Sequence, residues 1–170
     1  MLAQQIKRNG GPPVNAIMEQ QYPLFREYQA LRAQLLEILG DEDLEFSLLG
    51  NPSLGELCCN IGEVQMAYIA SFQTFGMDFS AQHAPAGVAK SISSLQSWYA
   101  RLDAELEEAV QGLSAEQLTQ KIDRGPDFQI TPSTQLEIYK EALLIFYGKA
   151  SIYMNAMGRL PGEQWQYWIA

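Results

Sequence analysis

Apolar residues recur every three or four positions through the first part of the chain, which is the spacing of one face of a helix. Near residues 15 to 39 this series is Leu24, Tyr28, Leu31, Leu35 and Ile38. Charged residues such as Arg32 fall between them, so the pattern predicts an amphipathic helix that Gly40 ends. Pro23 leaves two alternatives: the helix starts there, or it is kinked after an N-terminal helical segment.

The second apolar series has a clear start. Ser53 can cap a helix while Glu56, three residues later, reaches back to form a capping box. The stripe that follows is Leu57, Ile61, Val64, Tyr68, Phe72 and Phe75. Gly76 closes it, and residues 76–87 have the composition of a loop that forms a crossover connection.

Two more stripes fill the rest of the chain. The third is the most regular and contains Ile92, Leu95, Tyr99, Leu102, Leu106, Ala109 and Leu113. The last helix is expected to start at Thr131-Pro132 and to end at Gly158, with turn residues at 123–128 before it. Because no stretch alternates with period two, we predict an all-α, four-helix bundle that forms a single domain over residues 1–170. A short extra turn or hairpin is expected between the third and fourth helices.

Composition narrows the classes of partner. The chain has 20 acidic and 11 basic residues and a formal charge of -9, which disfavours binding to nucleic acid. Its apolar runs are too short to span a membrane. Residues 10–13 are Gly-Gly-Pro-Pro, where a signal peptide needs an apolar stretch, so the sequence predicts a cytoplasmic location.

A polar amide interrupts the second stripe. Asn60 lies between Leu57 and Val64, so we expect it to point into the bundle, either as a site residue or as an amide satisfied by a neighbouring helix. Glu63 either joins it in lining a pocket or is a solvated carboxylate. The aromatic residues Tyr139, Phe146, Tyr147 and Tyr153 either line a cavity or form core.

Two cysteines and one histidine complete the candidates. Cys58 and Cys59 are adjacent in a helix, where side chains point about 100° apart, so we expect reduced thiols that are structural rather than nucleophilic. The single histidine, His83, has no neighbouring ligands at metal-binding spacing. The sequence therefore predicts no metal and no cofactor.

Two segments carry a resemblance to a known family. The run Pro52-Ser53-Leu54-Gly55-Glu56-Leu57-Cys58-Cys59-Asn60-Ile61-Gly62-Glu63 resembles the second helix of the DinB-like (YfiT-like) superfamily. The run Gly148-Lys149-Ala150-Ser151-Ile152-Tyr153-Met154-Asn155-Ala156-Met157-Gly158, followed by Pro161, is similar to its last helix. The resemblance implies an up-down-down-up bundle, commonly dimeric, in which many members bind a divalent metal on three histidines and use it in thiol transfer, isomerisation or hydrolysis.

The positions that match those histidines are Asn60, Ala142 and Phe146, while Tyr147 and Lys149 match the family's arginine and glutamine. An amide oxygen binds zinc or nickel weakly, and the other two residues have no donor. We therefore predict a member without the metal site that binds a small apolar molecule or forms a homodimer. The alternatives are a thiol S-transferase or hydrolase with a non-standard site around Asn60, and a purely structural dimer partner.

Overall fold

The computed structural model describes residues 15–81 and 83–169. The polar segment before residue 15, from which a cytoplasmic location was predicted, lies outside this range. Four long helices dominate: α2 (Tyr22–Glu37), α3 (Leu54–Thr74), α4 (Ile92–Gln111) and α5 (Pro132–Ala156). Shorter elements are α1 (Ala16–Gln20), α6 (Glu163–Trp168), the 3-10 turns η1 (Asp41–Glu45) and η2 (Val88–Lys90), and the strands β1 (Ile122–Asp123) and β2 (Gln129–Ile130).

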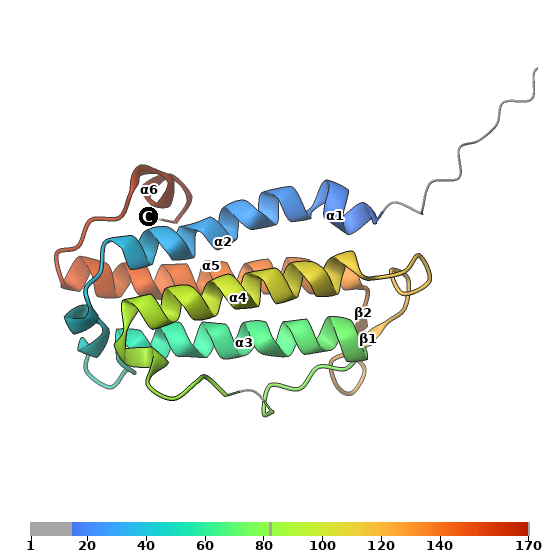
Figure 1. The fold of residues 1–170 in the computed structure, drawn as a ribbon, viewed down its shortest axis with the longest axis horizontal. Coiled ribbons are helices and arrows are strands. Elements are labelled where there is room, and N and C mark those ends of the chain that lie inside the picture. The colour runs from blue at the N-terminus through green and yellow to red at the C-terminus, as the bar shows by residue number, and fades with distance from the viewer. Residues whose placement is uncertain (1–14, 82, 170) are drawn as a thin grey trace, which may run out of the picture.

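The four long helices form an up-down-down-up bundle (Figure 1). Helices α3 and α4 run parallel to each other, and α2 and α5 run in the opposite direction. The connection between α3 and α4 travels the length of the bundle, as the predicted crossover requires. The predicted fold class is thus confirmed. None of the described helices has the length and apolar character needed to span a membrane.

Local hydrogen bonds explain where the helices begin. Ser53 Oγ accepts from the Glu56 amide at 3.2 Å, and Glu56 Oε2 accepts from the Ser53 amide at 2.7 Å, so the predicted capping box starts α3. The Thr131 hydroxyl caps α5 by accepting from the backbone of Thr134, with Pro132 in the first turn. Both starts were predicted because they depend on residues three positions apart.

The first helical region follows the second of the two alternatives left open by Pro23. Helix α1 is capped by Asn15, whose side chain accepts from the amides of Ile17 and Met18. The chain then breaks at Gln21, and α2 begins with Pro23 near its start. A proline lacks the amide that a continuous helix would need, so the two segments are separate.

The connection between α4 and α5 contains the predicted hairpin. Its two strands are antiparallel, with Ile122 opposite Ile130. Both isoleucines are buried, and the Asp123 backbone exchanges hydrogen bonds with Phe75 and Met77 at the end of α3. The hairpin therefore closes one end of the core.

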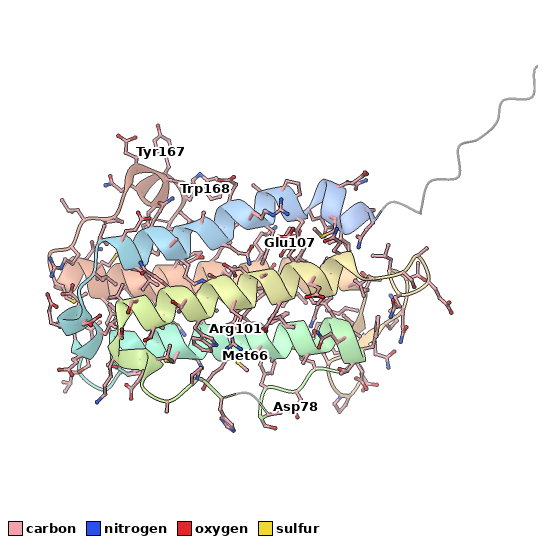
Figure 2. The ribbon with its side chains drawn as sticks, viewed as in Figure 1. Met66, Asp78, Arg101, Glu107, Tyr167 and Trp168 are labelled. Carbon is pink, nitrogen blue, oxygen red and sulfur yellow. The ribbon has the colours of Figure 1, made fainter. Side chains whose placement is uncertain are left out.

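The aromatic tail forms a helix that the sequence pattern did not predict. In α6, Trp165 is fully buried, and its Nε1 donates to Ser151 Oγ on α5 at 3.0 Å. Its ring lies 4.9 Å from that of Tyr147. Tyr167 on the same helix extends away from the bundle (Figure 2). Six residues are too few for a stable isolated helix, so α6 depends on Trp165 for its place.

Candidate functional site

The three positions matched to the family's metal ligands lie together in the folded chain. Asn60, Ala142 and Phe146 line one hollow of about 170 Å³ between α3 and α5, which we call the α3–α5 groove. Its remaining walls are apolar apart from one lysine: Leu57, Ile61, Val64, Ile145 and Lys149. The groove therefore brings Asn60 together with two residues, Ala142 and Phe146, that lie more than 80 positions later in the sequence.

The expectation that Asn60 points into the bundle is wrong, because its side chain is exposed. Neighbouring side chains on a helix diverge by about 100°, and the inner face of α3 is formed instead by Cys58, Ile61 and Gln65. Phe146, in contrast, is buried, and Ala142 is half-buried. Asn60 lies at the rim of the groove, where its amide remains accessible to a ligand.

A second hollow continues the groove along α5. It has a volume of about 260 Å³ and is lined by Leu48, Asn51, Pro52, Leu57, Lys149, Ile152 and Tyr153. Leu57 and Lys149 line both hollows. The Tyr153 hydroxyl is already engaged, since it donates to the carbonyl of Pro52 at 2.7 Å. The two hollows are therefore neighbours with mainly apolar walls, and we refer to them together as the depression.

The remaining candidates do not join this groove. Glu63 accepts a hydrogen bond from the Ala84 amide at 2.8 Å and so holds the crossover loop against α3. Tyr139 and Tyr147 are fully buried in the core and do not line the groove. Tyr147 donates to the carbonyl of Tyr28 on α2 at 2.5 Å, which is a structural contact between helices.

The interior of the bundle contains the charged side chain of Arg32, which the amphipathic pattern had assigned to the polar face of its helix. The guanidinium of Arg32 on α2 is 1% exposed. It donates to Gln65 Oε1 on α3 at 2.6 Å and to the Asp103 carboxylate on α4, and it stacks on the ring of Tyr99 with 3.9 Å to the centroid. Gln29 and Gln65 also donate to the same Asp103 oxygen, at 2.7 and 2.8 Å. We call these four polar side chains, Arg32, Gln65, Asp103 and Gln29, the Arg32 network.

The guanidinium of this network stays charged. Burial acts to lower the pKa of Arg32, whereas the Asp103 carboxylate and the surrounding tyrosines act to raise it. The second effect is the larger in sum, so the pKa of Arg32 lies above its ordinary value. A buried cation of this kind requires its partners. A signal for the burial existed in the sequence, because Phe25, Gln29, Arg32 and Leu36 share one helical face at spacings of four, three and four.

The two cysteines are poor nucleophiles. Burial raises the pKa of Cys58 to about 12, and burial together with Glu63 and Glu56 raises that of Cys59 to about 11. At neutral pH both are therefore thiols, whereas nucleophilic attack and metal binding require the thiolate. Cys58 is fully buried, and its backbone carbonyl accepts from the Tyr99 hydroxyl at 2.7 Å.

The side chains at these three positions do not suit the divalent metal that many DinB-like proteins bind with three histidines. Asn60 offers an amide oxygen, whereas the Ala142 methyl and the Phe146 ring have no lone pair for a metal. Within residues 15–81 and 83–169, no group of three or more His, Cys, Asp or Glu side chains is placed to hold a metal ion. His83 is an exposed residue of the crossover loop.

Comparison with known proteins identifies the fold. The sequence matches no protein-family model and no curated protein. Among solved structures it is similar to YjoA, a DinB-like protein from Bacillus subtilis, with a TM-score of 0.63 and 17% identity over 80% of this chain and 90% of that one. An identity this low carries the fold and not the activity. The chain therefore has the helical fold of a DinB-like protein.

Proposed function

We propose that this chain is a DinB-like bundle that acts by binding rather than by metal-dependent catalysis, and that the α3–α5 groove takes a small apolar molecule. The observation that carries the proposal is the convergence of Asn60, Ala142 and Phe146 on one hollow. These are the positions that the resemblance matches to metal ligands, yet they present a methyl group, a phenyl ring and one amide. Such walls favour an apolar ligand oriented by few polar groups.

A fluorescent apolar probe tests the proposal. The uncharged dye N-phenyl-1-naphthylamine is expected to bind with enhanced emission. Ala142→Trp fills the groove and should weaken binding at least tenfold. Ala104→Trp, at an exposed position of α4 outside the groove, is the matched control and should bind as the parent does. Equal binding by both variants would locate the ligand elsewhere, and purified protein that retains stoichiometric zinc, nickel or iron would contradict the loss of the metal site.

A homodimer is the second candidate function, and a specific feature favours it. Ile145, which lines the groove, and Ile152, which lines the second hollow, are 61% and 59% exposed on α5. These side chains lie seven residues apart, about two turns along the same face of α5, and exposed apolar side chains that form a contiguous patch mark surfaces that pack against a partner. Light scattering should report twice the monomer mass for the parent and the monomer mass for an Ile145→Glu/Ile152→Glu variant. A parent that is monomeric at high concentration rules this candidate out.

The enzymatic alternative has less support. A thiol S-transferase or hydrolase around Asn60 would need an activated nucleophile, and the raised pKa values of Cys58 and Cys59 oppose thiolate formation. Screening with low-molecular-weight thiols and electrophiles tests it, with Asn60→Ala as the control. Turnover that disappears in Asn60→Ala would favour the enzyme over the binding protein.

A further inference from the structure

If the groove binds an apolar molecule as proposed, its lining residues also indicate the chemical class of that ligand. The α3–α5 groove and the second hollow meet at Leu57 and Lys149, which line both. A ligand that occupies both hollows must therefore pass the Lys149 side chain. Because most of the remaining walls are aliphatic or aromatic, the charge of Lys149 is the main polar feature that a ligand of the two hollows would meet.

Lys149 has no ion-pair partner in the described part of the chain. Neither hollow is lined by an Asp or Glu side chain, and among the described residues no second Lys or Arg lines them. This lone ammonium stands out in a chain with a formal charge of -9. A single cation between two apolar surfaces is complementary to a molecule that has one anionic group and an apolar body.

The other polar groups along the depression agree with this pattern. The Tyr153 hydroxyl and the Asn51 amide nitrogen already donate, to the carbonyls of Pro52 and Leu49 respectively. Asn60, about one helical turn from Leu57 on α3, can offer an amide N–H at the rim of the groove. The donors that remain are thus Lys149, Asn60 and the second N–H of Asn51, and among the described residues no carboxylate lines either hollow to repel an anion.

We infer that the ligand of the α3–α5 groove is an anionic amphiphile of the fatty-carboxylate class, with its carboxylate paired to Lys149 where the two hollows meet and its alkyl chain in the α3–α5 groove. The ammonium supplies the charge-assisted hydrogen bond, which is stronger than one between neutral groups. The aliphatic walls supply the burial of methylene groups. The ion pair is at the surface, so it contributes orientation and selectivity more than affinity.

The test compares two probes of equal chain length, decanoate and 1-decanol, by titration calorimetry near pH 7.5. The parent should bind decanoate about two- to fivefold more tightly than decanol, as expected of an exposed ion pair, and added salt should reduce this preference. Lys149→Met should bind both probes equally, while Lys149→Arg should keep the preference. Lys121→Met removes an exposed lysine outside both hollows and is the matched control, which should behave as the parent does.

The outcomes separate this inference from the proposed function. Equal binding of both probes by the parent, or a preference for decanoate that survives in Lys149→Met, overturns the assignment of Lys149 and leaves the apolar groove in place. Binding of neither probe refutes the proposed function and the inference with it. Melting curves of the Lys149 variants, which should match that of the parent because the side chain is exposed, show that any loss comes from the site.

Discussion

Removal of the Asp103 carboxylate should destabilise the bundle far more than removal of an exposed carboxylate on the same helix. One oxygen of Asp103 accepts hydrogen bonds from Arg32, Gln29 and Gln65. In Asp103→Leu these donors lose their acceptor, and the guanidinium of Arg32 keeps its charge with only Gln65 and the Tyr99 ring beside it. The perturbation leaves a buried cation without a counter-ion.

The magnitude follows from the burial of the pair. Breaking a buried ion pair by removing one partner costs about 3–5 kcal/mol. Arg32 is 1% exposed but the Asp103 side chain is 33% exposed, so water can replace part of what is lost. We therefore expect the lower end, about 3 kcal/mol of unfolding free energy. At about 2–4 °C per kcal/mol for a chain of this size, the melting temperature should fall by about 6–12 °C.

Urea unfolding followed by circular dichroism measures the effect, with two further variants. Glu107→Leu is the control, because Glu107 (labelled in Figure 2) lies on the same helix, four residues after Asp103 in the sequence. Its pair with Arg26 joins side chains that are 37% and 53% exposed, so the loss should be about 1 kcal/mol or less. The double variant Arg32→Met/Asp103→Leu removes both charges and should be more stable than Asp103→Leu alone. Its coupling energy should be about 1–3 kcal/mol.

Two results would refute this reasoning. An Asp103→Leu variant that loses no more stability than Glu107→Leu would mean that Arg32 is hydrated in solution and not buried. A double variant whose loss equals the sum of the single losses would mean that Arg32 and Asp103 do not interact. Asp103→Asn, which keeps an acceptor oxygen and removes the charge, should fall between Asp103→Leu and the parent.

Three further predictions concern other parts of the bundle. Unfolded thiols titrate near pH 9, whereas the folded pKa values of Cys58 and Cys59 are about 12 and 11, so their contribution to stability is present below pH 9 and is lost as pH rises towards 12. Urea unfolding between pH 8 and 11 should show a smaller decline for Cys58→Ala/Cys59→Ala than for the parent, and identical declines would contradict the shifts. A methyl group on Gly55 would lie 2.0 Å from the Ala89 carbonyl oxygen, so Gly55→Ala should cost about 3 kcal/mol. An added methyl group on Gly148 would meet no atom within 4 Å, so Gly148→Ala should instead stabilise α5 by about 0.5–1 kcal/mol. Equal changes in melting temperature for Gly55→Ala and Gly148→Ala would show that α3 is not in contact with η2. Trp165→Ala should cost about 3 kcal/mol and make α6 sensitive to limited proteolysis, whereas unchanged resistance would mean that α6 does not depend on this side chain.

Local sequence patterns predict the four long helices and the crossover and hairpin that connect them. The starts at Ser53 and Thr131 depend on hydrogen bonds that span three residues, so they can be read from local sequence. The resemblance matched Asn60, Ala142 and Phe146 to one site, and these residues do line one groove. Local patterns succeed here because the contacts that fix a helix end lie within one turn of it.

Which polar side chains are inside depends on contacts between helices, even where, as for Arg32, the helical spacing gives a signal of burial. A polar residue between apolar ones can face either way, and its partners on other helices determine which. Arg32 is buried because Gln65 and Asp103, 33 and 71 positions away, receive its hydrogen bonds. Asn60 has no such partner inside and lies at the surface. The burial of α6 is likewise set by α5, because six residues cannot fold alone and Trp165 needs a surface to cover.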